Sequence, residues 1–231
     1  ITADIYPYTY WESTLTVLFP NRDFDNREAA EFALSEVTTP EGAYLSVFKP
    51  NPDYVGRSVL EISQMRETDP ATTLMELIRE AHRYQQQSGE TDVESVVAVS
   101  MDEADIQRLM NWPHTNLCTD GSLVASHPRG FGSYPRFLGR YVRERRVMDL
   151  ATAVHKSTGL AARHIGIRDR GTIAPGLKAD LVLFDPATVI DHATPSAPEA
   201  LSTGVRQVWV NGVTVFENGK ASGKYPGQLV R

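Results

Sequence analysis

Two short apolar segments joined by a helix constrain the fold of this sequence more than any other feature. Val93 to Ser100 is a continuous apolar run of strand length, and a second short run extends from Thr115 to Cys118. Between them, Asp102 can cap a helix. Strands that are apolar throughout are typical of sheets buried on both faces, and parallel strands need a crossover between them. The pattern therefore predicts two parallel strands of an α/β fold.

A third strand and further helices surround that unit. Ile1 to Tyr6 is rich in β-branched and aromatic residues and stops at Pro7, which cannot donate to a sheet. Helix starts are predicted near Asp25, at the capping-box pair Ser58 and Glu61, at Asp69-Pro70, which precedes a helix ending at Gly89, and at Asp149. The first part of the chain is thus mixed α/β.

The last part of the chain changes character. From Gly171 onward it consists of short strand-like runs separated by glycine, proline and an Asn211-Gly212 pair. That pair between two alternating runs is a strong hairpin signal. We predict a boundary at residues 166–171, with a small β-rich region after it.

Composition and charge narrow the class of protein. The chain has 231 residues, 41% hydrophobic and 23% charged, which indicates ordinary globular material. Its formal net charge is -6 and its basic residues are dispersed, so we expect no nucleic-acid partner. No apolar run reaches the length of a membrane span, so we expect no membrane partner. The single cysteine, Cys118, excludes an internal disulfide and favours the cytoplasm.

Functional groups of parallel α/β proteins gather at the carboxyl ends of strands. Asp120 directly follows the strand that ends at Cys118, with Gly121 beside it. This carboxylate is a candidate general base near a metal-bound water, and the alternative is a cap on the following turn.

Two other segments carry candidate binding groups. Tyr6 stands at the first strand end, with Ser13 downstream; a phenol can polarise a carbonyl and a hydroxyl can bind substrate, although aromatics there more often pack. Arg129 offers a planar fork suited to a carboxylate, and its alternative is a surface role. His127 has no second ligand at metal spacing, which favours a structural or supporting role.

Four segments together resemble the amidohydrolase superfamily, and specifically its N-acyl-D-amino-acid deacylase (D-aminoacylase) group. They are Asp4–Tyr8; Cys118–Gly121 with His127–Gly132 and Phe137–Val142; Thr158–Arg163; and Asp169–Gly176 with Ala179–Pro186. The last is typical of the whole superfamily, whereas the Asp-Gly to His-Pro-Arg segment is more specific to these deacylases. Residues 24–89 are less typical and resemble an enlarged connection.

The resemblance implies a fold and a domain division. It implies the C-terminal part of a metal-dependent (β/α)₈ TIM barrel, with three barrel strands in this chain, plus a small β-sandwich domain. We expect residues 1–168 to be the barrel part, with an inserted helical connection around 24–89, and residues 169–231 to be the β-rich part.

The resemblance also implies a chemistry: zinc-dependent hydrolysis of the amide bond of an N-acyl-(D-)amino acid. Asp120 would touch the metal, take a proton from the attacking water and pass it to the leaving amine. Arg129 and Ser13 would bind the substrate carboxylate, and Tyr6 would polarise the scissile carbonyl. The other zinc ligands would come from the N-terminal half of the protein, the expected partner, so this chain alone would be inactive.

Two other functions stay open. An incomplete barrel has unpaired strand edges, so the chain can instead be a non-enzymatic remnant whose barrel face binds another chain. The same metal chemistry also serves cyclic-amide and dipeptide hydrolysis. A His-x-His motif upstream of Ile1 would favour the deacylase.

Overall fold

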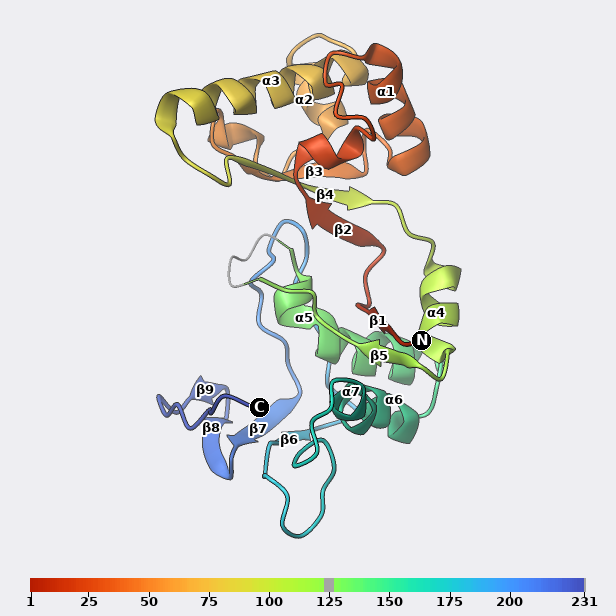
Figure 1. The fold of residues 1–231 in the computed structure, drawn as a ribbon, viewed down its shortest axis with the longest axis vertical. Helices are drawn as coiled ribbons and strands as arrows, with labels where there is room; N and C mark the ends of the chain where they lie inside the picture. The colour runs from red at the N-terminus through yellow and green to blue at the C-terminus, as the bar shows by residue number, and fades with distance from the viewer. Residues whose placement is uncertain (123–126, 231) are drawn as a thin grey trace.

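The computed structural model describes residues 1–122 and 127–230 and contains three sheets (Figure 1). The strands are β1 (Ala3–Ile5) and β5 (Thr115–Leu117) in the first sheet; β2 (Tyr10–Ser13), β3 (Ala43–Phe48) and β4 (Glu94–Val99) in the second; and β6 (Leu181–Phe184), β7 (Val205–Val210), β8 (Val213–Glu217) and β9 (Lys220–Ala221) in the third. The first sheet lies between the other two along the molecule.

Helices connect these strands. They are α1 (Arg27–Phe32), α2 (Val59–Met65), α3 (Pro70–Ser88), α4 (Glu103–Asn111), α5 (Arg129–Arg136), α6 (Leu150–Ser157) and α7 (Gly159–His164), with 3₁₀ helices η1 (Leu15–Leu18) and η3 (Pro52–Tyr54) and π-helical segments η2 (Ala33–Val37) and η4 (Phe137–Glu144). None of the helices in the described part of the chain is long and apolar enough to cross a membrane.

The first sheet is a parallel pair. β1 and β5 run in register from Ala3 opposite Thr115 to Ile5 opposite Leu117. Helix α4 packs against both strands, and a small core joins it to α6 and η4. Because the strands are parallel, their carboxyl ends lie at the same edge of the sheet, where residues that follow the two strands can share a site.

The prediction that Val93–Ser100 forms a strand parallel to Thr115–Cys118 was wrong about the pairing. The strand exists as β4, but it pairs antiparallel with β2 and β3 and lies between them, so β1 and β5 remain the parallel strands of the described chain. The apolar run reflects burial of Val96, Val97 and Ala98 at the centre of this second sheet. A central antiparallel strand covered on both faces is as apolar as a parallel one, so the pattern could not separate them.

The second sheet and helices α1–α3 form one packed unit, with the helices gathered on one side of the sheet (Figure 1). Its core includes Leu15, Leu45, Phe48, Leu74 and Ile78. Strands as well as helices therefore make up the connection between β1 and α4.

Local capping signals explain where several helices start. Ser58 and Glu61 form a reciprocal capping box on α2, which confirms that prediction. Asp69 caps α3 and Gly89 ends it with a φ of 73°, as predicted. The α1 prediction was one residue off, because Asn26 is the cap while Asp25 pairs with Arg79 at 2.6 Å.

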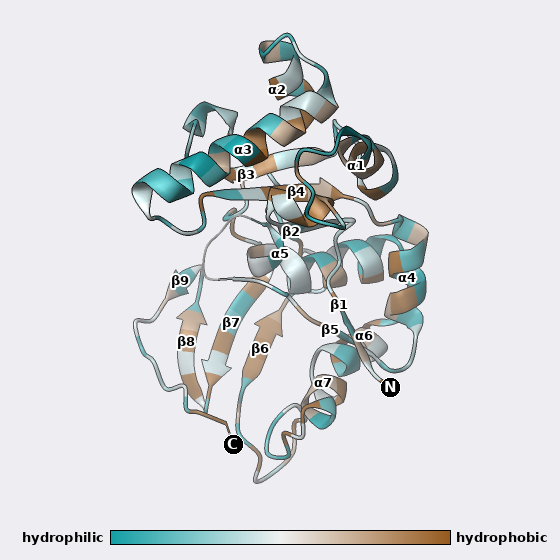
Figure 2. Ribbon diagram, turned by 45° about the horizontal axis from the view of Figure 1, so that its top comes forward, coloured by the Kyte–Doolittle hydropathy of each residue, from teal (hydrophilic) through white to brown (hydrophobic). Residues whose placement is uncertain are grey.

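The third sheet follows the predicted hairpin. β7 and β8 are antiparallel, and Asn211 and Gly212 between them have φ values of 48° and 78°. Both residues of this turn type need positive φ, which explains the Asn-Gly pair. Figure 2 shows apolar residues along β6, β7 and β8 and polar residues along much of α3.

Candidate active site

Three of the four predicted site residues meet at the carboxyl ends of β1 and β5. Tyr6 follows β1, and Asp120 follows β5 after the amide of Cys118 donates to the carbonyl of Ile5 at 3.0 Å. Arg129 is the first residue of α5. Its Nη1 lies 3.0 Å from Oδ2 of Asp120, and its guanidinium carbon lies 5.0 Å from the centre of the Tyr6 ring.

The Asp120 carboxylate is presented to solvent by an unusual backbone. Asp120 has a φ of 46°, in the left-handed region where few residues other than glycine occur. A Cβ at the next residue, Gly121, would lie 2.7 Å from the Cα of Gly130. Only glycine at position 121 allows its backbone to approach Gly130 so closely. This contact holds the turn at Asp120 and Gly121 against the start of α5. The Asp120 side chain is 61% exposed and can reach a ligand.

Arg129 is held more tightly than its partner. Its side chain is only 12% exposed, between the Asp120 carboxylate and the Tyr6 ring. A guanidinium carries five N–H donors, so the pair with Asp120 still allows it to bind a second anion. Burial raises the pKa of the Tyr6 phenol, and the neighbouring Arg129 counteracts that rise. Tyr6 therefore stays a neutral donor near pH 7.

Ser13 lies apart from these three residues in its described contacts. It is the last residue of β2, opposite Val96 of β4, and its carbonyl accepts a hydrogen bond from Ser95 at 3.1 Å. No contact described for Ser13 reaches Tyr6, Asp120 or Arg129. Its assignment to the site remains a prediction.

A buried aromatic cluster supports the site. His127 is 4% exposed, and its ring centre lies 5.5 Å from that of Tyr8 and 4.9 Å from that of Tyr10. The guanidinium of Arg136 lies 4.7 Å over the Tyr8 ring and 3.3 Å from the carboxylate of Asp191. This last pair links α5 to the segment before β7.

Sequence reasoning missed most of this cluster. Tyr8 lies in the same Asp4–Tyr8 motif as Tyr6, and that motif was the usable signal for it. Asp191 lies 55 residues from Arg136 and no motif connects them. Only the tertiary arrangement identifies that ion pair.

The described residues do not complete a metal site by themselves. Residues 1–122 and 127–230 contain no group of three or more histidine, cysteine, aspartate or glutamate side chains that could hold an ion. Asp120 fits as one oxygen ligand, because carboxylates bind zinc and this one is accessible. Burial raises the pKa of the Cys118 thiol to about 11, which disfavours the thiolate that a metal needs.

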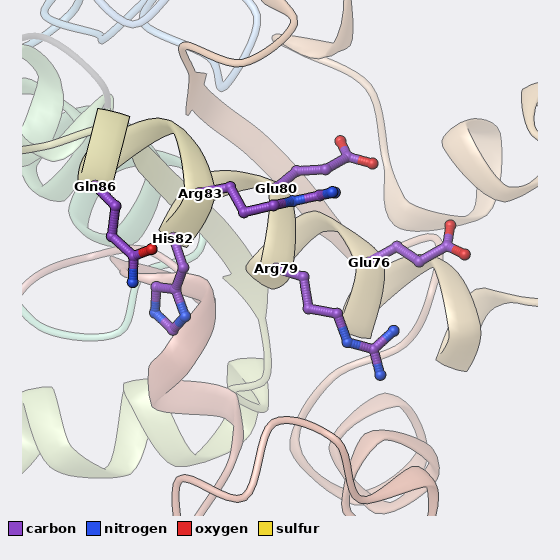
Figure 3. Close-up of a pocket in the computed structure, with 6 residues that line it drawn as sticks. All are labelled: Glu76, Arg79, Glu80, His82, Arg83 and Gln86. Atoms are coloured by element: carbon purple, nitrogen blue, oxygen red, sulfur yellow. The ribbon is translucent and has the colours of Figure 1, made fainter. Parts of the chain in front are cut away.

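The surface has one hollow beside Tyr6 and another on α3. The first, of about 360 Å³, is lined by Asp4, Tyr6, Met101 and α4, next to β1. The second, of about 630 Å³, lies on α3, and its lining side chains spread in different directions from this one helix (Figure 3). Three of them, Glu76, Arg79 and Glu80, are in ion pairs. Of the three residues that meet at the strand ends, only Tyr6 lines the first hollow, and none of them lines the second.

Comparisons with known proteins show similarity to the amidohydrolase family and to deacylases of N-acyl-D-amino acids. The amidohydrolase family profile matches residues 104–216. An N-acyl-D-aspartate deacylase of Alcaligenes xylosoxydans xylosoxydans is 45% identical over 132 residues, which is 56% of this chain and 26% of that protein. An N-acyl-D-glutamate deacylase of the same organism is 34% identical over the whole chain, which covers 41% of that protein.

Solved structures give the same relatives. The N-acyl-D-glutamate deacylase of Bordetella bronchiseptica, in complex with zinc and a phosphonate inhibitor, matches the whole chain with a TM-score of 0.78 and 33% identity, over 42% of its own length. A D-aminoacylase described as having a binuclear metal centre matches 96% of the chain with a TM-score of 0.76 and 32% identity, over 41% of its length. The chain thus spans less than half the length of these proteins.

Proposed function

We propose that this chain is part of an amidohydrolase of the N-acyl-D-amino-acid deacylase group and supplies part of the active site of a zinc-dependent deacylase. The reaction would be hydrolysis of the amide bond of an N-acyl-D-amino acid, giving a carboxylate and a free amino acid. The remaining metal ligands would come from the parts that the longer relatives have in addition.

The observation that carries this proposal is the meeting of Asp120, Arg129 and Tyr6 at one edge of the β1–β5 sheet. It places an accessible carboxylate 3.0 Å from a guanidinium, with a phenol below that guanidinium. The substrate has a carboxylate beside its amide bond. A site for it needs a cation next to a proton-transfer group, which this arrangement offers.

Each residue has a role that its surroundings permit. Arg129 would bind the α-carboxylate of the substrate through its remaining donors. Asp120, which is accessible, would take a proton from the attacking water and deliver it to the leaving amine. Tyr6 would donate its hydroxyl proton to the scissile carbonyl as negative charge develops there. Ser13 would assist Arg129 in binding that carboxylate.

Zinc is the metal that the resemblance favours. When bound, the ion would act as a Lewis acid and make water a better nucleophile at neutral pH. Asp120 would be its ligand from this chain. We therefore expect the chain alone to be inactive and to hold zinc weakly, because one carboxylate is too few ligands.

The domain division is also a proposal. Residues 1–168 would complete a (β/α)₈ barrel with the additional parts, with a connection around 24–89 inserted, and residues 169–231 would belong to a β-sandwich. The cytoplasmic location rests on the single Cys118.

The proposal can be tested with a chimera. The whole chain would be joined to the portion of the Alcaligenes N-acyl-D-glutamate deacylase that it does not cover. We expect the chimera to bind zinc and to release free amino acid from N-acetyl-D-amino acids. Aspartate, glutamate and neutral substrates would be compared to define the side-chain preference.

Two variants and a control make the test specific. Asp120→Asn should lower kcat by about 10²–10⁴-fold, as loss of a general acid-base group does. Arg129→Lys should mainly raise KM, because lysine lacks the planar fork. Glu31→Gln removes a surface ion pair with Arg27 and should change neither constant. A folded, zinc-loaded chimera that hydrolyses none of these substrates would refute the proposal.

A further inference from the structure

His127 joins two parts of the chain that lie far apart in sequence. One ring nitrogen, Nε2, lies 3.1 Å from the carbonyl oxygen of Tyr10 on β2. The other, Nδ1, accepts a hydrogen bond of 2.9 Å from the backbone amide of Arg129 at the start of α5. The ring is almost fully buried and has edge contacts with Tyr6 and Tyr8.

These two partners determine the tautomer of the ring. A carbonyl oxygen can only accept and a backbone amide can only donate, so Nε2 must carry the proton and Nδ1 must be bare. A doubly protonated ring would place an N–H against the N–H of Arg129. Burial lowers the pKa of His127 to about 4, in agreement with a neutral ring at neutral pH. Both nitrogens are thereby engaged, so His127 does not serve as a metal ligand in this arrangement.

The hydrogen bond to Arg129 has a consequence for the site. The first amides of a helix have no partner within the helix, and Arg129 is the first residue of α5. Nδ1 of His127 supplies that partner and so fixes the backbone of Arg129. The guanidinium of the same residue then lies between the ring of Tyr6 and the carboxylate of Asp120.

We propose that His127 is a positioning residue, which uses its bare Nδ1 to hold Arg129 in place for the substrate carboxylate and its Nε2–H to tie this element to β2. The proposal rests on the proposed function for its catalytic consequence. Its structural part stands on the two hydrogen bonds and the burial of the ring.

Isosteric variants separate the two hydrogen bonds. In His127→Asn, the side-chain oxygen takes the place of Nδ1 and can still accept from Arg129. In His127→Gln, the side-chain amide takes the place of Nε2 and can still donate to Tyr10. His127→Leu removes both, and His114→Asn, at an exposed histidine beside Trp112, is the control.

The first measurement does not depend on activity. Nitrogen-15 NMR of the histidine-labelled chain should show a neutral ring with the proton on Nε2, unchanged from pH 5.5 to 8. Amide hydrogen exchange at Arg129 should be slow in the native chain and in His127→Asn, and about tenfold faster in His127→Gln and His127→Leu. A proton on Nδ1, or equal exchange in the Asn and Gln variants, would overturn the proposal.

The second measurement uses the chimera. KM for an N-acyl-D-amino acid should rise about tenfold in His127→Gln and His127→Leu but less than about threefold in His127→Asn, with kcat changed less than KM. The difference should vanish for the matching carboxamide substrate, which has no carboxylate for Arg129. A merely structural role would affect both substrates alike and would contradict the proposal.

Failure of the proposed function is distinguishable from failure of this inference. An inactive chimera whose native Arg129 amide is protected through Nδ1 would refute the deacylase assignment and leave the positioning role supported. An active chimera in which the Asn and Gln variants have equal KM values would refute the positioning role alone.

Discussion

Glu94 gives the most quantitative prediction that the structure supports. It stands on β4, and its Oε2 accepts a hydrogen bond of 2.7 Å from the amide of Leu15 at the start of η1. No basic side chain in the described part of the chain forms an ion pair with it. Burial raises the pKa of Glu94 from its ordinary 4.5 to about 7, and the Leu15 hydrogen bond opposes only part of that rise.

The sign of the effect on stability follows from proton binding. Between pH 4.5 and 7 the folded state binds more protons at Glu94 than the unfolded state, so the free energy of unfolding falls as the pH rises. The penalty is absent below pH 4.5 and complete above pH 7. At about 1.4 kcal/mol per pH unit, the penalty amounts to about 3 kcal/mol.

Glu94→Gln should remove this penalty. A glutamine keeps an oxygen that can accept from Leu15 but carries no charge to desolvate. We expect the variant to unfold at higher urea than the native chain at pH 8, by up to about 3 kcal/mol, and at nearly equal urea at pH 4.5. Fluorescence of Trp11, which packs against the same core, can follow the transition.

Glu36→Gln is the matched control, because Glu36 is an exposed carboxylate of the same packed unit. Carbon-13 NMR of the Glu94 carboxyl would give its titration midpoint directly. A midpoint below pH 5.5, or a Glu94→Gln variant no more stable than native at pH 8, would refute the reasoning.

Three further predictions concern packing, reactivity and capping. Gly132→Ala would place a Cβ 2.2 Å from the Tyr8 hydroxyl, so we expect a loss of about 1–3 kcal/mol in the free energy of unfolding, measured by urea titration; an unchanged value would show that Tyr8 can move freely. Burial raises the pKa of the Cys118 thiol to about 11, so at pH 7.5 it should react with iodoacetamide about a hundredfold more slowly than free cysteine. In the urea-unfolded chain the reaction rate should equal that of free cysteine. A fast reaction of the folded chain would contradict the burial of this thiol. Ser58→Ala should cost about 1 kcal/mol by thermal unfolding, whereas a Ser88→Ala control outside the capping box should cost less.

The sequence by itself determined the local structure. The capping box at Ser58, the left-handed Gly89 at the end of α3 and the Asn211-Gly212 turn all depend on residues within a few positions of each other. Short-range hydrogen bonds and backbone preferences do not depend on the rest of the chain, so they can be predicted from it directly. The family resemblance was readable for the same reason, because its motifs are contiguous.

Part of the candidate site was predictable too. Asp120 and Tyr6 each follow a strand, and the rule that parallel strands share a functional edge was enough to associate them. Arg129 came from its motif. That its guanidinium lies between the other two side chains follows only from the packing of α5 against that edge.

Only the tertiary structure decided which strands are neighbours and which distant residues pair. An apolar run such as β4 can be buried in a parallel or an antiparallel sheet. The apolar composition of a strand results from its burial and does not depend on the direction of the neighbouring strands. The His127 bridge from Tyr10 to Arg129 and the Arg136–Asp191 pair join segments with no shared motif. Such contacts depend on the relative placement of whole elements, which results from the sum of many weak packing energies and not from any local pattern.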